Sequence, residues 1–159
     1  MGTFPQLTEE DFDQFNGALT DLLAKTEANA ALIVEKAGHL IHQCGKNANF
    51  DVATMATLSS NAFNAVQFMG SLLTENSFNA LYQEGQTSSI LMLNVDENAL
   101  LVVIFQAPTS VGMVKYYASG TIGRIAEQIK IAEKRAPDVR FDFSDMNVTD
   151  SEDFFRKKK

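Results

Sequence analysis

Cysteine is almost absent from this sequence, since Cys44 is the only one among 159 residues. A single thiol excludes an internal disulfide and a metal site made of cysteines alone, and it suits a reducing compartment. Tryptophan is missing as well, although twelve phenylalanines can supply large apolar side chains. The N-terminal stretch MGTFPQLTEEDF lacks the basic and apolar segments of a signal peptide, so we expect a cytoplasmic protein.

Positive charge and long apolar runs are also scarce. Thirteen Lys and Arg stand against twenty Asp and Glu, which gives a formal net charge of −7. This balance argues against nucleic acid as a partner, because phosphate contacts need clustered basic residues. The longest apolar runs, such as ALLVVIF at 99–105, are too short to cross a bilayer. We therefore expect a globular domain without membrane insertion.

Helical and strand-like patterns alternate along the chain. Apolar residues recur at helical spacing in three segments, 8–26, 51–74 and 111–134. Short apolar runs predict five strands, at 30–35, 39–44, 80–84, 89–95 and 99–105. The order α-β-β-α-β-β-β-α predicts an α+β fold, in which helices cover a five-stranded antiparallel sheet, over residues 1–136. The last two runs are nearly continuous in apolar residues, which is typical of central strands covered on both faces.

Caps and turns support these boundaries. Thr8 can cap the first helix, with Asp11 at the spacing of a capping box. Gly38 supplies a turn position between the first two strands, and 96–98 (Asp-Glu-Asn) predicts a tight turn between the last two. Ser110 is a suitable cap for the third helix, which Pro137 ends.

The second helix has two distinct sides. One carries an apolar stripe, which we predict to face the sheet: Met55, Leu58, Ala62, Val66, Met69 and Leu73. The other side is mostly small and polar: Thr57, Ser60, Asn61, Asn64 and Phe68. We expect this second side to meet another protein, while an ordinary solvated face remains the alternative.

The third helix has an inner side made of Val114, Ala118, Ile122, Ile125, Ile129 and Ala132. Its glycines Gly112, Gly120 and Gly123 are expected to allow close packing against the sheet. Gly120 and Gly123 lack the strand before them and the GK[ST] ending of a phosphate loop, so no nucleotide site is predicted there.

No catalytic, cofactor or metal site is predicted. His39 and His42 lie three residues apart in a predicted strand, so they point to opposite faces and cannot share a metal ion. Cys44 has no basic neighbour before Lys46, which favours a structural thiol over a nucleophile. The acids at the start of the first helix suit capping better than acid–base catalysis.

The residues from 137 to 159 differ in composition from the rest. Between Asp138 and Asp153 the chain holds six acids and one arginine, and it ends in RKKK. This acidic segment also contains Phe141 and Phe143, and Phe154 and Phe155 follow it. We expect a flexible tail, or one that becomes ordered on a partner.

Taken together, several segments resemble the Roadblock/LC7 family over about residues 8–135. They are ALIVEKAGHLIHQCG, the helix DVATMATLSSNAFNAVQFMGSLL, YQEGQTSSILMLNV and LLVVIFQAPTSVGMVKYYA. Their order and spacing are similar to those of the MglB-type bacterial GTPase-activating proteins.

The resemblance implies a homodimer that binds one small Ras-like GTPase of the MglA type and stimulates its GTP hydrolysis in cell polarity or motility. The second helices would pack side by side, and the third strands would join two sheets through Ala80, Leu81, Tyr82, Gln83 and Glu84. The GTPase contact would fall on Thr57, Ser60, Asn61, Asn64 and Phe68. Asn64 and Phe68 depart from the very small residues that MglB-type chains have at these positions. The tail phenylalanines Phe141, Phe143, Phe154 and Phe155 would offer a further docking segment.

The same resemblance implies a regulator rather than an enzyme. Activation would need no inserted arginine, which agrees with the position of Arg124 in the middle of the third predicted helix. Two alternatives remain open. One is a dimeric scaffold that binds a GTPase or other proteins without changing hydrolysis, and the other is a small-ligand sensor, which the scarcity of polar residues in the apolar strands disfavours.

Overall fold

The computed structural model describes residues 3–46, 50–74 and 78–135. The helices are α1 (Glu9–Thr26), α2 (Val52–Leu72) and α3 (Val111–Arg135). The strands are β1 (Ala30–Glu35), β2 (Leu40–Gly45), β3 (Ala80–Glu84), β4 (Ser88–Asn94) and β5 (Ala99–Gln106). This order and the single five-stranded sheet confirm the predicted fold class. The predicted tail, with its four phenylalanines, lies outside the described residues.

The strands lie in the order β2-β1-β5-β4-β3, and all neighbouring strands are antiparallel. β5 occupies the centre, and every residue from Ala99 to Phe105 is buried. This burial explains why its sequence is apolar without alternation, as predicted for a strand covered on both faces. β2 and β3 form the two edges.

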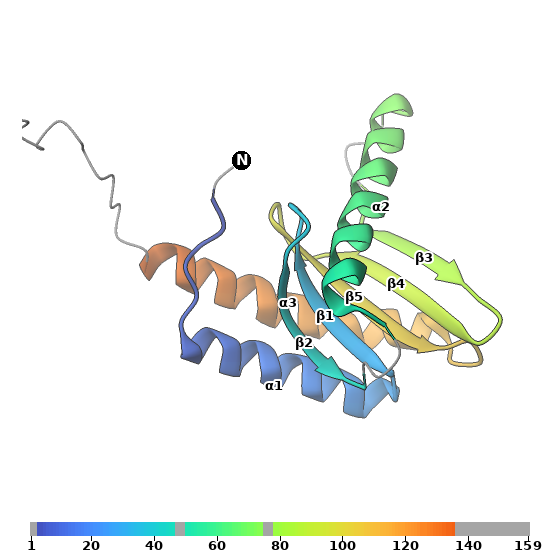
Figure 1. The fold of residues 1–159 in the computed structure, drawn as a ribbon, viewed down its shortest axis with the longest axis horizontal. Helices are drawn as coiled ribbons and strands as arrows, with labels where there is room; N and C mark the ends of the chain where they lie inside the picture. The colour runs from blue at the N-terminus through green and yellow to red at the C-terminus, as the bar shows by residue number, and fades with distance from the viewer. Residues whose placement is uncertain (1–2, 47–49, 75–77, 136–159) are drawn as a thin grey trace, which may run out of the picture.

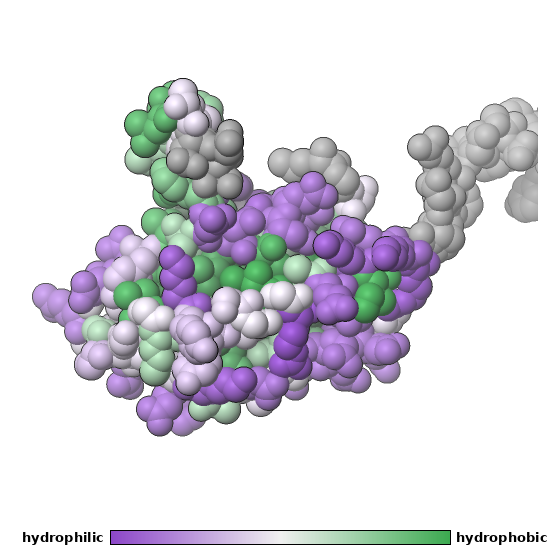
Figure 2. Space-filling model, turned by 180° about the vertical axis from the view of Figure 1, so that it is seen from behind, coloured by the Kyte–Doolittle hydropathy of each residue, from purple (hydrophilic) through white to green (hydrophobic). Residues whose placement is uncertain are grey.

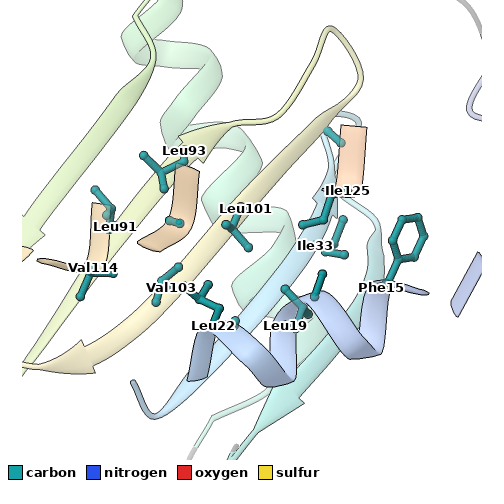
Figure 3. Packing of buried hydrophobic residues seen from close by; sticks show 14 of the residues in the cluster. Phe15, Leu19, Leu22, Ile33, Leu91, Leu93, Leu101, Val103, Val114 and Ile125 are labelled. Atoms are coloured by element: carbon teal, nitrogen blue, oxygen red, sulfur yellow. The ribbon is translucent and has the colours of Figure 1, made fainter. Parts of the chain in front are cut away.

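The two faces of the sheet carry different helices. Figure 1 shows α1 and α3 side by side on one face, while α2 crosses the other face over β1 and β2. Alternate residues of each strand therefore enter different cores, as strand geometry requires. Ile33, Leu101 and Val103 pack against α1 and α3 (Figure 3), whereas Leu32 and Val102 face α2.

Local hydrogen bonds define the boundaries of these elements. Thr8 and Asp11 form the predicted capping box at the start of α1, and Asp51 accepts hydrogen bonds from two backbone N–H groups of α2. Gly38 has a φ of +107°, which glycine adopts at low cost. The Asp96 carboxylate accepts the N–H groups of Asn98 and Ala99, which closes the predicted tight turn.

The predicted inner stripe of α2 is wrong in part, since Met55 and Ala62 pack against the core on this face but the other large side chains do not. Leu58 and Met69 are each 59% exposed, and Leu73 follows the helix and is also exposed. The buried side of the helix is instead formed by smaller residues around one phenylalanine, of which Ala56 and Phe63 join the core: Ala56, Ser59, Ser60, Phe63 and Gly70. Both sides of the helix carry apolar residues. The side with the smaller residues is buried because it allows the helix to pack more closely on the rest of the domain.

The predicted role of the α3 glycines is wrong as well. A Cβ placed on Gly120 or Gly123 would meet no atom within 4 Å, and one on Gly112 would meet only the Ser110 hydroxyl at 3.6 Å. These glycines face away from the sheet. The inner side of α3 is otherwise as predicted, except that Thr121 is buried and Ile122 is only half-buried.

Candidate protein-interaction site

The outer side of α2 carries a regular row of apolar residues. We call the row Leu58, Ala62, Ala65, Met69 and Leu72 the α2 seam; its members follow one another at alternating spacings of four and three residues. All are exposed except Ala62, which is half-buried at the margin of the core. That spacing is the one with which two helices pack side chains into each other's surfaces. Leu72 at the end of the row is 72% exposed. Figure 2 shows hydrophobic residues on the end of α2 that projects from the body.

Polar residues beside the seam hold α2 against the turn between β1 and β2. The Thr57 hydroxyl donates to the Gly38 carbonyl at 3.1 Å. The Ser60 hydroxyl donates to the Lys36 carbonyl. The Asn64 amide donates to the same carbonyl at 3.2 Å. Two of the predicted contact residues, Thr57 and Asn64, are therefore exposed but also fix the helix to the turn.

Ser60 was expected on the outer side, and this placement is wrong. Its side chain is 1% exposed because it lies between α2 and the Lys36 backbone. Asn61 and Phe68 do lie outward, and Phe68 is 69% exposed. The predicted set is thus divided into one buried residue, two that hold the turn, and two that face outward.

Lys36 connects this site to the turn between β4 and β5. Its ammonium donates to the Asp96 carbonyl at 2.6 Å and lies 5.9 Å from the centre of the Phe63 ring. Its backbone N–H donates to the Asn98 carbonyl at 2.8 Å. Burial lowers the pKa of Lys36, although the nearby Asp96 and Glu97 carboxylates oppose that effect. One residue therefore positions two turns and α2 at the same end of the sheet.

The C-terminal half of α2 is attached to the segment that leads into β3. The Gln67 amide donates to the Phe78 carbonyl, and its oxygen accepts the Phe78 N–H at 3.1 Å. A Cβ on Gly70 would lie 2.9 Å from the Phe78 ring, so only glycine allows this close approach. The attachment holds this half of α2 against the residues that lead into β3.

The β3 edge itself is partly polar. Ala80 and Leu81 are half-buried, whereas Tyr82, Gln83 and Glu84 are exposed. The Tyr82 ring stacks on Phe105 with the ring planes 8° apart, which holds its side chain against the α1 and α3 face. Among the described residues, β3 pairs only with β4, so no described strand occupies its other backbone edge.

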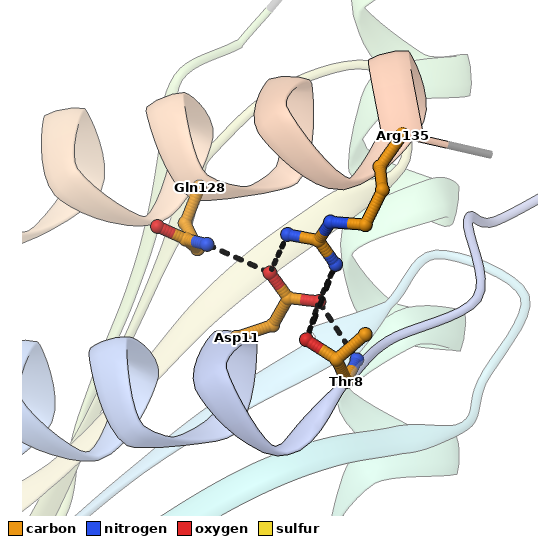
Figure 4. Close-up of polar contacts among 4 residues, drawn as sticks. All are labelled: Thr8, Asp11, Gln128 and Arg135. Atoms are coloured by element: carbon orange, nitrogen blue, oxygen red, sulfur yellow. Dashed lines mark hydrogen bonds and ion pairs between the residues drawn. The ribbon is translucent and has the colours of Figure 1, made fainter.

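The opposite face of the molecule contains an ion pair with one buried member. The Asp11 carboxylate is fully buried and accepts two hydrogen bonds from the Arg135 guanidinium, at 2.8 and 3.0 Å (Figure 4). The Gln128 amide and the Thr8 N–H also donate to it, both at 2.7 Å. Arg135 above all, and the other donors, hold the pKa of Asp11 well below its usual range against the effect of burial. The cluster joins the start of α1 to the end of α3.

Other candidates are accounted for by structural contacts. Arg124 forms an ion pair with Asp21 at 2.7 Å on the surface that α1 and α3 share. The Cys44 thiol lies 3.1 Å from the Asn16 side-chain oxygen, and the His42 ring lies 3.2 Å from the same oxygen. His39 instead contacts Glu35 at 2.9 Å.

No group of three or more His, Cys, Asp and Glu side chains in ranges 3–46, 50–74 and 78–135 is arranged to hold a metal ion. Within the same ranges, no helix has the length and apolar character needed to cross a membrane.

Residues 16–105 match the model of the Roadblock/LC7 domain, which is more than half of the chain. The chain belongs to the Roadblock/LC7 family. No curated protein matches it in sequence. Among solved structures, it is similar to Myxococcus xanthus MglB, with 28% identity and a TM-score of 0.75, over 80% of this chain and 96% of that one. The MglB gliding protein of Thermus thermophilus has 22% identity and a TM-score of 0.74, over 82% of this chain and 99% of that one. An MglB with a tetrameric arrangement, at 22% identity, has a TM-score of 0.75, over 83% of this chain and 99% of that one.

Sequence reasoning missed the seam as a surface and the partners of Asp11. The seam shares Leu58, Ala62 and Met69 with the predicted inner stripe, and its 4-3 spacing was the signal that could have identified it. Arg135 and Asp11 are 124 residues apart, and no local pattern pairs residues so distant.

Proposed function

We propose that this chain forms a homodimer that regulates a small Ras-like GTPase of the MglA type, as a GTPase-activating protein in bacterial polarity or motility. The observation that carries the proposal is the α2 seam. A helix whose outer side bears leucine and methionine at 4-3 spacing is suited to a protein partner rather than to water. Membership of the Roadblock/LC7 family and the likeness to Myxococcus MglB support the same interpretation.

In the proposed dimer, the α2 helices of two chains pack along their seams. Ala62 and Ala65 in the middle of the row allow the helix backbones to approach closely, while Leu58, Met69 and Leu72 supply apolar area. The β3 edges, with Tyr82 and Glu84, would pair with each other and extend the sheet across the dimer.

The proposed GTPase contact lies beside the seam. Asn61 and Phe68 project outward, and Phe68 offers an apolar side chain of the type that dominates binding energy at interfaces. Thr57 and Asn64 add polar groups held in place by the turn carbonyls. Ser60 is excluded from direct contact by its burial and instead supports the helix.

Activation through this face would act on the GTPase's own catalytic groups. The arginines among the described residues, Arg124 and Arg135, both belong to α3 and pair with aspartates on the other side of the sheet. Neither arginine can therefore extend from the α2 face to the nucleotide bound in the GTPase, as an inserted arginine would have to do.

The proposal is tested by the GTP hydrolysis rate of a cognate MglA-type GTPase with and without the full chain. We expect faster hydrolysis with the wild-type chain, and much weaker stimulation and binding with Phe68→Arg. The matched control is Tyr116→Arg, because Tyr116 is 73% exposed on α3 and lies outside the proposed contact. Binding without acceleration would support the scaffold instead, and equal effects of the two variants would contradict the proposed face.

A further inference from the structure

An open groove runs along the outer side of α3, away from the sheet. It has a volume of about 540 Å³ and is lined by Gly123, Ala126, Glu127, Lys130, Ile131 and Lys134. Its size is within the range of about 300–1,000 Å³ that is typical of ligand pockets. The Ile131 side chain is 45% exposed, so part of the groove is lined by a solvent-exposed apolar side chain.

Two features make the groove suitable for aromatic side chains of an acidic segment. At Gly123, a Cβ would meet no atom within 4 Å, so the missing side chain leaves space beside the helix. Lys130 and Lys134 both line the groove, and neither forms an ion pair with any of the described residues. Glu127 also lines the groove, so the positive charge is confined to the end that Lys130 and Lys134 form. An occupant should therefore combine apolar side chains with negative charge placed at that end.

We propose that the groove binds residues 138–155 of the same chain. This segment has six acids and one arginine up to Asp153, and it contains Phe141, Phe143, Phe154 and Phe155. The acids match Lys130 and Lys134, and the phenylalanines match the apolar floor at Gly123 and Ile131. The occupant is the tail that continues directly from α3, so no second molecule has to be brought in.

The length of the chain permits this arrangement. From Lys134 back to Gly123, the groove extends along α3 for about 16 Å, at about 1.5 Å per residue. Phe141 lies six residues beyond Arg135, and six extended residues span about 20 Å. The phenylalanines at 154 and 155 have still more chain available. The bound tail would lie on the face opposite α2, so the inference does not depend on the proposed GTPase role.

Filling the groove provides the sharpest test. Gly123→Leu should displace the phenylalanines, whereas Gly120→Leu is a matched control, because a Cβ at Gly120 also meets open space but Gly120 does not line the groove. Limited chymotrypsin digestion of the full chain, followed by intact mass measurement, reports how fast the tail is cut after its phenylalanines. Since such cleavage tracks the undocked population, we expect it to be about three- to tenfold faster in Gly123→Leu than in wild type or Gly120→Leu.

Charge reversal provides a second, independent test. Lys130→Glu together with Lys134→Glu should also accelerate cleavage about three- to tenfold, while Lys115→Glu, outside the groove on the same helix, should not. Adding Asp142→Lys and Asp145→Lys to the double variant should restore protection. Helical circular dichroism and the melting temperature verify that each variant is folded.

Three results would overturn the inference. Cleavage could proceed at the same rate in all variants, or the Gly120 and Gly123 variants could be affected equally. Protection that disappears on dilution would show that the groove is occupied by a second copy instead, because docking within one chain does not depend on concentration.

Discussion

Met69→Ser should weaken the proposed dimer strongly without unfolding the protomer. Met69 is 59% exposed in the single chain, so association can still bury more than half of its side chain. Fully burying such a side chain contributes about 1.5–3 kcal/mol, which leaves about 0.9–1.8 kcal/mol for each copy. A two-fold dimer loses the contribution twice, or about 2–3.5 kcal/mol. The dimer dissociation constant should therefore rise about 30- to 300-fold.

Sedimentation equilibrium over a range of concentrations measures this constant directly. Tyr116→Ser is the matched control, because Tyr116 has at least as much exposed area but lies on α3 at the other face. The reasoning is refuted if the wild-type chain is monomeric at all concentrations, or if both substitutions change the dimer constant equally. A loss of helical signal at high dilution would point to an unfolding protomer rather than a dissociating one.

Three further predictions concern stability. Asp11→Ala should lower the free energy of unfolding by about 2 kcal/mol, because the donors Thr8, Gln128 and Arg135 lose a charged acceptor. Urea denaturation at neutral pH measures this change, and an unchanged midpoint would contradict the prediction. The pKa of Asp11 is lowered in the folded chain, so its contribution is complete above the unfolded-state pKa of about 3.9 and is lost as the pH falls below that value. Wild type should accordingly lose stability more steeply than Asp11→Asn below about pH 4, and parallel curves would rule this out. Gly38→Ala should lower the free energy of unfolding by about 1–2 kcal/mol, because Gly38 has a φ of +107° that alanine adopts only with strain. Thermal melts measure the loss, and Gly120→Ala, where a Cβ meets open space, is the control.

Periodicity predicted the elements because each depends on local sequence. The strand at 80–84 and the order of all eight elements follow from apolar runs and turn residues that are close together in the chain. The orientation of α2 could not be predicted in the same way. Both of its sides carry apolar residues at helical spacing, and only the sheet determines that Phe63 and Ala56 face inward while Leu58 and Met69 face outward.

The candidate site was predictable only in part, because its side chains are assigned by contacts between distant segments. The small polar side chain of Ser60 is typical of a surface, but its hydroxyl donates to the Lys36 carbonyl in the interior, 24 residues earlier in the chain. Phe68 and Asn61 were correctly placed on the outer side. Whether they bind a GTPase remains a prediction that the experiments above address.

The strand order also has a consequence for how the chain folds. β1 and β2 form one local hairpin, and β3, β4 and β5 form a second local unit of consecutive antiparallel strands. A single ladder joins the two units, with β1 against β5 from Ala30 opposite Ile104 to Glu35 opposite Ala99. Closing this ladder brings together residues on either side of α2, so it carries the largest loop-closure entropy in the sheet. Substitutions that weaken the β1–β5 contact should therefore slow folding, whereas changes at the outer surface of α2 should leave the folding rate of the protomer unaltered.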